Sequence, residues 1–270
     1  MPRFKIFLEY DGTRYSGWQI QKNARTVQGE ITNAVAKIFP SERFEIMGAG
    51  RTDAGVHALE QVAHLDVQTM LAPEIIRMRL NDVLPADICV IEIEKTARTF
   101  HARHDAVARS YLYQISRRRT AFGKRFVWWV KDPLDVRLMR QTGSRFKGMN
   151  DFRSFTADDP DEKSTSVLIE ELEIDEVDSI ILIRVVGSHF LWKMVRQMVG
   201  VMVEAGRGKM DPGEVDALLS AQSQKPAATT APPSGLYLER VYYKGDARLT
   251  RLTPLLAISD NRRPSLRRGK

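Results

Sequence analysis

A glycine-rich stretch from residue 48 to residue 57 carries the side chains best suited to chemistry. It holds one carboxylate, Asp53, and one cation, Arg51, among three glycines. Glycine lets a backbone turn sharply or approach a ligand closely, and a guanidinium beside a carboxylate favours its ionised form. An ionised, oriented carboxylate can act as a nucleophile or a base. The residues alone leave open a second use, in which Asp53 only caps backbone amides in a tight turn.

Other chemistries find less support in the spacing. The stretch lacks the spacing and the lysine of a Walker phosphate loop, and Gly48-Ala49-Gly50 lacks the third glycine of a dinucleotide fingerprint. No pair of histidines has helical metal-ligand spacing or a cysteine partner, so we expect no metal site. The histidines are at positions 57, 64, 101, 104 and 189.

Composition limits the possible partners and the compartment. The 270 residues include 41 basic and 34 acidic side chains, a net charge of +7 that favours a polyanion such as nucleic acid. No apolar run approaches the roughly 20 residues that cross a bilayer, so we expect no membrane span. The single cysteine, Cys89, lies in an apolar run, which predicts a buried thiol in a reducing compartment. The chain opens on a strand pattern without a signal-peptide core, which predicts a cytoplasmic protein.

In the first half of the chain, the periodicity of apolar residues predicts strands on both sides of the glycine-rich stretch. Thr26 is a good helix cap, and the helical pattern after it ends at Pro40. A second helix is predicted to begin near Pro73 and to bury Ile76, Leu80 and Val83. The predicted strands are residues 4–10, 44–47, 61–67 and 88–94.

The second half repeats this mixture of strands and helices. Because strands outnumber the helices that parallel crossovers would need, the pattern favours an α+β fold. Whether the sheets of the two halves join is left open by the pattern. The predicted strands are 106–116, 167–177, 180–186 and 236–243, the helices 133–146, 190–205 and 212–219, and the loop 222–235.

An ordered set of motifs, spanning residues 4 to 243, resembles the TruA family of tRNA pseudouridine synthases. The segment from Gly48 to Ala58, with Arg51-Thr52-Asp53 at its centre, closely resembles the signature of that family. Further matches are Glu9-Tyr10-Asp11-Gly12, Val27-Gln28, Arg109-Ser110-Tyr111-Leu112-Tyr113, Asn150-Asp151-Phe152, Met194-Val195-Arg196, Ala231-Pro232 and Gly235-Leu236.

The resemblance implies a fold and an assembly. It implies two α+β subdomains of RNA-recognition-like topology around a central, mainly antiparallel sheet, with a cleft between them. On this sequence we expect an N-terminal subdomain at residues 1–104 that carries the Asp53 loop, and a C-terminal subdomain at 105–260. Residues 261–270 contain five basic residues, and we expect a flexible basic tail there. The family works as a homodimer with no cofactor and no metal.

The resemblance also implies an activity and a set of site residues. The family isomerises uridine to pseudouridine at nucleotides 38–40 of the tRNA anticodon stem-loop, so the expected partner is tRNA and not DNA. Asp53 falls on the nucleophile, Tyr111 on the tyrosine against the target base and Arg196 on a basic residue near the aspartate. Leu236 falls on a small apolar wall. Arg51 could fill the space left by an extruded base or hold a phosphate.

Alternatives remain open for individual residues and for the function. Tyr111 lies on a strand where core packing is common, and Arg196 could be a snorkelling surface arginine. The aromatic residues from Phe122 to Trp129, after Arg117-Arg118-Arg119, could stack on RNA or pack between subdomains or subunits. The rival functions are a synthase of different RNA or position specificity, a catalytically silent RNA-binding module, and a metal-dependent hydrolase that lacks ligand spacing.

The sequence departs from the family pattern just before the predicted helix at 190–205. Ser188-His189-Phe190 replaces the usual asparagine, and Trp192-Lys193 stands where the family has Tyr-His. The basic C-terminal tail is also extra. These differences bear on RNA contacts and on the nucleotides accepted, and they leave Asp53 and Tyr111 in place. The sequence does not choose among attack of Asp53 on C1′, attack on C6 and removal of the 2′ proton.

Overall fold

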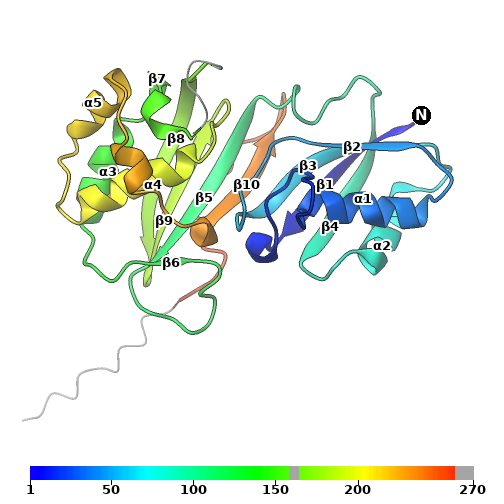
Figure 1. The fold of residues 1–270 in the computed structure, drawn as a ribbon, viewed down its shortest axis with the longest axis horizontal. Coiled ribbons are helices and arrows are strands. Elements are labelled where there is room, and N and C mark those ends of the chain that lie inside the picture. The colour runs from blue at the N-terminus through cyan, green and yellow to red at the C-terminus, as the bar shows by residue number, and fades with distance from the viewer. Residues whose placement is uncertain (158–163, 259–270) are drawn as a thin grey trace, which may run out of the picture.

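A single mixed sheet forms the centre of the computed structural model, which describes residues 1–157 and 164–258. Within these ranges its strands are β1 (Arg3–Tyr10), β2 (Phe44–Gly48), β3 (His57–Val67), β4 (Ile88–Thr96), β5 (Ala108–Ser116), β6 (Trp128–Trp129), β7 (Gly148–Asp151), β8 (Ser166–Val177), β9 (Ile180–Gly187) and β10 (Leu236–Tyr242). The main path runs β4-β1-β3-β10-β5-β9-β8-β7 (Figure 1). Most neighbours are antiparallel, whereas β10 beside β3 and β6 beside β5 are parallel. This mainly antiparallel sheet confirms the predicted α+β class.

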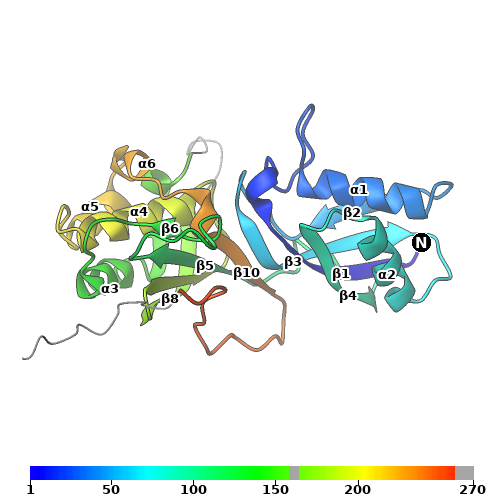
Figure 2. The ribbon, with the colours of Figure 1, turned by 90° about the horizontal axis from the view of Figure 1, so that it is seen from below.

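The helices form two groups, one on each half of the sheet (Figure 2). Within the described residues, α1 and α2 belong to the N-terminal half, and the others gather on the C-terminal half. The helices are α1 (Val27–Ile38), α2 (Pro73–Val83), α3 (Val136–Ser144), α4 (Met194–Gly206), α5 (Glu214–Ser220) and α6 (Lys225–Ala228).

Local sequence signals position several of these elements as predicted. In β1 the side chains of Phe4, Ile6 and Leu8 are buried, and the alternate positions are more exposed, as a one-sided strand requires. Helix α1 begins after Thr26, whose hydroxyl accepts a hydrogen bond from the Gly29 N–H at 3.2 Å. The hairpin of β8 and β9 turns at residues 178–179, as predicted.

Two helices begin later than their apolar patterns predict. Helix α3 begins at Val136 and not at Pro133, because Asp135 is its cap and accepts hydrogen bonds from the first-turn backbone N–H groups. Helix α4 begins at Met194 and not near Phe190. The residue before it, Lys193, has φ +62°, so the backbone there is left-handed and cannot continue a helix.

Three smaller predictions are also corrected. The segment predicted as a loop, 222–235, contains the single turn of α6 and a 3₁₀ turn at Pro233–Gly235. Val83 ends α2 on its exposed side, so it does not join the buried face of that helix. Cys89 is half-buried, because it points away from the face of β4 that carries the buried Ile88 and Val90.

The last strand joins the two halves of the sheet. β10 pairs in parallel with the start of β3, where Leu238 lies opposite Ala58. On its other side it pairs antiparallel with β5, where Leu238 lies opposite Tyr111. The start of β3 follows directly on the loop that contains Asp53. The strand order therefore brings that loop, Tyr111 and the segment before β10 to the middle of the sheet (Figure 1).

Two apolar clusters support the two halves, and each includes residues from the other half of the chain. Leu238 and Val241 of β10 pack in the N-terminal cluster with Phe4 and Ile6. Val56, from the N-terminal half, packs in the C-terminal cluster. The division into residues 1–104 and 105–260 stays a prediction, and the predicted tail at 261–270 lies outside the described residues. No helix in the described ranges is long and apolar enough to span a membrane.

Candidate active site

The loop that carries Asp53, residues 49–56, connects β2 to β3 and is held by the segment that follows β1. The Trp18 N–H donates to the Thr52 carbonyl at 3.1 Å, and the Gly55 N–H donates to the Tyr15 carbonyl at 3.2 Å. The hydroxyls of Tyr10 and Thr52 are 2.8 Å apart in a buried hydrogen bond. The Asp53 loop is therefore anchored on both sides of the carboxylate, as a preorganised site requires.

Two glycines at this loop have backbones in the left-handed region. Gly55 has φ +76°, in the left-handed region that favours glycine. Gly17, in the anchoring segment, has φ +90°, and a Cβ there would lie 2.4 Å from the Thr52 carbonyl oxygen. The glycine-rich stretch contains two more glycines, Gly48 and Gly50. A Cβ at Gly48 would lie 2.5 Å from the Trp18 ring, whereas a Cβ at Gly50 would meet open space.

Asp53 meets a guanidinium, and that guanidinium belongs to Arg196. Asp53 Oδ2 and Arg196 Nη1 are 3.4 Å apart, and the two side chains are 23% and 14% exposed. Arg196 lies in the first turn of α4, and its Nε donates to the Ala231 carbonyl at 2.7 Å, which fixes the direction of the side chain. Arg51 is exposed, and no ion pair joins it to Asp53 in the described part of the chain. Residue types alone therefore favoured the wrong arginine, whereas the family resemblance placed Arg196 near the aspartate, where the structure has it.

The pKa of Asp53 is raised above its ordinary value, which corrects the expectation that a neighbouring guanidinium alone would decide it. Burial is the largest cause, and it raises the pKa because it removes water from the charged form. The charges of Arg196 and Lys193 and a hydrogen bond from Trp192 lower the pKa and oppose burial only in part. The result is a carboxylate that is more basic than a free aspartate and is still accessible to a ligand.

Tyr111 lies at the centre of β5, between Leu238 of β10 and Val185 of β9. Its side chain contacts both apolar clusters, and Phe190 packs edge-on against its ring at 4.9 Å. Burial, followed by the negative charge of Asp53, raises the pKa of its hydroxyl to about 12. The hydroxyl is therefore protonated at neutral pH and can donate a hydrogen bond toward a bound base.

Arg109, whose place in a motif did not by itself predict a role, links the backbone segments around the site. Its guanidinium donates to four backbone carbonyls, those of Ala49, Arg103, Ala106 and Ser188, at 2.8–3.1 Å. The first of these belongs to the Asp53 loop and the last to the segment before α4. The sequence did show a charged residue in a strand that is otherwise mostly apolar. That pattern could not predict that the partners of the Arg109 guanidinium are backbone carbonyls.

Leu236, the predicted apolar wall, begins β10 and is only 5% exposed, with its side chain in the C-terminal cluster. The segment before it is fixed by Tyr113, whose hydroxyl donates to the Pro232 carbonyl at 2.8 Å. Because Arg196 also binds this segment through Ala231, the wall and the cation are positioned together. Contact between Leu236 and a ligand stays a prediction.

The histidine nearest to Asp53 along the chain serves the structure of the site. His57 Nδ1 accepts a hydrogen bond from the Gly12 N–H at 3.1 Å, and its Nε2 lies 3.1 Å from the Arg125 carbonyl. Burial lowers the pKa of His57, so the ring is neutral and its Nε2–H donates to that carbonyl. In the described ranges no three metal-ligand side chains are grouped to hold an ion.

The basic and aromatic segment 117–131 divides between packing and exposure. Trp128 packs on Tyr113 in the interior, with ring centroids 6.2 Å apart. Phe122 is 89% exposed, and Trp129 is 41% exposed beneath the guanidinium of Arg119. The inner aromatic residues therefore serve the core, and the outer ones are available for a partner.

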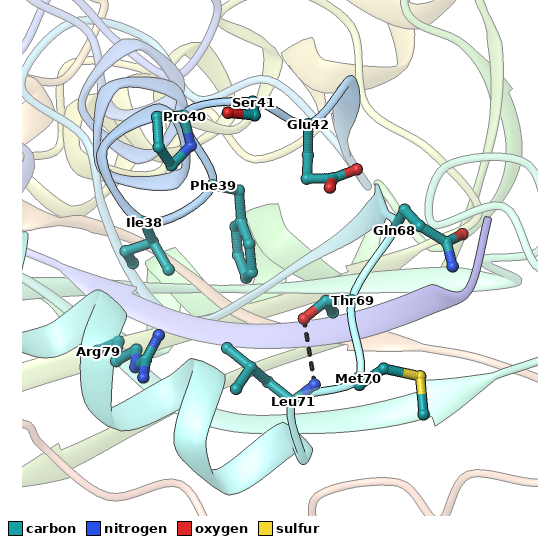
Figure 3. A pocket seen from close by; sticks show the side chains of 10 residues that line it. All are labelled: Ile38, Phe39, Pro40, Ser41, Glu42, Gln68, Thr69, Met70, Leu71 and Arg79. Atoms are coloured by element: carbon teal, nitrogen blue, oxygen red, sulfur yellow. Dashed lines mark hydrogen bonds between the residues drawn. The ribbon is translucent and has the colours of Figure 1, made fainter.

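A surface hollow of about 470 Å³ lies away from Asp53, between the end of α1, the segment after β3 and α2. In Figure 3, Phe39 and Leu71 line its apolar side, and Arg79 extends from α2. The hollow follows the far end of β3, whereas Asp53 precedes the near end, and an eleven-residue strand spans roughly 35 Å. The hollow is therefore separate from the site at Asp53.

One protein family matches two long segments of the chain. A family described as tRNA pseudouridine synthase matches residues 6–105 and 144–244, which include Asp53, Arg196 and Leu236 but not Tyr111. A solved Cbf5-Nop10-Gar1 complex covers 72% of this chain and 46% of its own, at 13% identity and a TM-score of 0.35, a likeness too low to bear on function.

Curated relatives match most of the chain. One named tRNA pseudouridine synthase A, from an Exiguobacterium species, is 39% identical over 244 residues, which cover 90% of this chain and 99% of that protein. Proteins of the same name from Moorella thermoacetica and Rhodopseudomonas palustris are 40% and 41% identical over 90% of this chain and all of theirs. Because the family matches most of the length of this chain, and because these relatives are about 40% identical to it, the chain belongs to the tRNA pseudouridine synthase family.

Proposed function

We propose that this protein isomerises uridine to pseudouridine at nucleotides 38–40 of the tRNA anticodon stem-loop, with Asp53 as the nucleophile. The observation that carries the proposal is the contact between Asp53 and Arg196, 143 residues apart in sequence, at an accessible position beside Tyr111. Membership of the family supports the reaction and the tRNA substrate. A catalytically silent RNA-binding module would have no need for this pairing of a basic carboxylate with a fixed cation.

The reaction rearranges bonds within one nucleotide. The bond from C1′ to N1 breaks, the detached uracil turns, a bond from C1′ to C5 forms, and the C5 proton leaves while N1 gains one. A uridine in a stem must first leave the stack. Asp53 supplies the carboxylate for attack on C1′, attack on C6 or removal of the 2′ proton. In this proposal the protonated hydroxyl of Tyr111 orients the base and assists transfer of the C5 proton, which its pKa of about 12 and its proximity to the charge of Asp53 support.

The decisive experiment is to map pseudouridines in tRNA after incubation with the pure protein. We expect new pseudouridine at nucleotides 38, 39 and 40, and none when those uridines are replaced by cytidine. Modification confined to another position would keep the chemistry and overturn the proposed specificity. A complete lack of pseudouridine on folded tRNA, with RNA binding intact, would favour the silent module.

Replacing Arg117, Arg118 and Arg119 by alanine is expected to weaken tRNA binding and flatten its dependence on salt. Each arginine that releases counterions from phosphate contributes about one to the slope of log K against log salt. Arg117 is already paired with Glu176 at 3.5 Å, so we expect the slope to fall by less than the full value for three arginines. The measurement is tRNA affinity across a salt series.

The matched control for this triple variant is Arg43, Arg77 and Arg79 changed together to alanine. These arginines are exposed at the far end of the N-terminal half, and the change removes the same charge. We expect a smaller loss of affinity and an almost unchanged slope. Equal effects from the two variants would remove segment 117–131 from the proposed RNA surface.

Activity is expected to survive chelation, because the rearrangement involves no net oxidation and the sequence has no convincing set of metal ligands. The enzyme is treated with EDTA and then assayed for pseudouridine formation on tRNA that was folded beforehand and keeps its structure under the assay conditions. A rate within about twofold of the untreated enzyme is expected. Loss of activity that zinc restores would contradict this prediction.

We further propose a homodimer that acts on tRNA in the cytoplasm. The support is the resemblance to the family, together with exposed Phe122 and Trp129, which offer apolar surface to a second subunit or to RNA. Sedimentation at working concentrations is expected to give twice the 30.7 kDa mass of the chain. A monomer that is fully active under the same conditions would count against the dimer.

A further inference from the structure

Trp192 presents a large aromatic surface beside Asp53. Its side chain is 48% exposed, and it also contributes a hydrogen bond to Asp53. Its carbonyl accepts a hydrogen bond from the Ala157 N–H at 3.1 Å, which fixes the backbone of the segment before α4. By contrast, Trp18 is buried and restricts Gly48 in the anchored region, as a purely structural tryptophan does.

Lys193 accompanies Trp192 at the same rim of the site. Its ammonium lies 4.7 Å from the centroid of the Trp192 ring, and its charge acts on Asp53. Its backbone is left-handed, with φ +62°, a conformation that costs free energy for a residue other than glycine and that is found preferentially at functional sites. An aromatic face, a cation and the reactive carboxylate therefore meet at the start of α4.

The following inference rests on the proposed function. We propose that Trp192 is a stacking platform for a nucleobase of the substrate RNA next to Asp53, and that Lys193 binds a phosphate of the same strand. Stacking on an exposed aromatic ring suits any base, because every base has a π face. A nucleotide extruded toward Asp53, or its unstacked neighbour, has lost its partners in the helix and needs such a surface. The pair would bind and position the substrate, while Asp53 performs the chemistry.

The test uses the full chain with Trp129 replaced by phenylalanine as the reference, so that Trp192 dominates the accessible tryptophan fluorescence. Saturating tRNA is expected to shield this fluorescence from acrylamide, and an added Trp192→Phe change is expected to remove the shielded signal. The Trp192→Ala variant is expected to need an enzyme concentration about ten to a hundred times higher to reach half of the maximal single-turnover rate. Trp192→Phe, which keeps an aromatic face, is expected to stay within about fivefold, and Lys193→Gln to lower the salt slope by about one.

Several outcomes separate this inference from the proposed function. A parent that forms pseudouridine while Trp192→Ala stays within twofold in half-saturation would overturn the stacking role alone. Unchanged access of acrylamide to Trp192 in the RNA complex would do the same. A parent that forms no pseudouridine, but whose Trp192 is shielded by tRNA, would refute the proposed reaction and support the platform. Thermal unfolding of each variant identifies any loss that comes from misfolding.

Discussion

Asp53→Asn is expected to slow pseudouridine formation at least about a thousandfold, equivalent to about 4 kcal/mol of activation free energy. Asparagine has nearly the same shape and can still hydrogen-bond in the anchored loop, so folding should be retained. It cannot replace a carboxylate as a nucleophile or base, because the amide is far weaker in both roles. Binding of tRNA should persist or tighten slightly, since one negative charge is removed near a polyanion.

The measurement is single-turnover pseudouridine formation at saturating enzyme, so that a change in affinity is not mistaken for a change in chemistry. The matched control is Asp11→Asn. Asp11 is also a half-buried aspartate near the loop. Its Oδ1 accepts a hydrogen bond from the Thr13 N–H at 2.9 Å and lies 3.2 Å from His57 Nδ1. We expect this variant to keep its rate within about tenfold. If Asp53→Asn also turns over within tenfold, Asp53 is only a turn residue.

Arg196→Gln is expected to lower the single-turnover rate about a hundredfold and to shift its dependence on pH. Burial already raises the pKa of Asp53, and the charge of Arg196 opposes that rise. Without the cation the pKa rises further. In the proposed mechanism the active form of Asp53 is the ionised carboxylate, so the rate should be lost as pH falls through this pKa. The acid limb of the profile should therefore move to higher pH, and raising the pH should restore part of the rate.

Two further variants separate this electrostatic effect from damage to the fold. Arg196→Lys keeps the positive charge and should leave the acid limb near its original position, although it loses the Nε contact to Ala231. Arg207→Gln removes an arginine at the other end of α4 that is paired with Asp132 at 2.8 Å. That change should lower thermal stability without moving the limb. An Arg196→Gln profile that superimposes on the parent profile would show that Arg196 does not control the ionisation of Asp53.

Local chemistry along the chain was sufficient to predict much of the framework. The alternation in β1, the Thr26 cap of α1 and the turn between β8 and β9 each depend on a few neighbouring residues. The start of α4 was misplaced, because an apolar run does not reveal the left-handed backbone at Lys193. Asp53 was singled out by its motif, and its loop lies between two strands, as the periodicity of apolar residues predicted.

The arrangement of the site depended on contacts between distant parts of the chain. Periodicity could not predict that β10 lies between β3 and β5, because strand pairing over nearly the whole chain is decided by packing and not by local preference. The partner of Asp53 illustrates the same point, since Arg51 is two residues away in sequence and Arg196 is 143 residues away. The sequence by itself determined which carboxylate is present and how its loop can turn. Residue types alone favoured Arg51 as the cation beside Asp53, and only the family resemblance pointed to Arg196. The tertiary structure decided that Arg196 faces Asp53 and that burial raises the pKa of this carboxylate, because both depend on what the fold places around it.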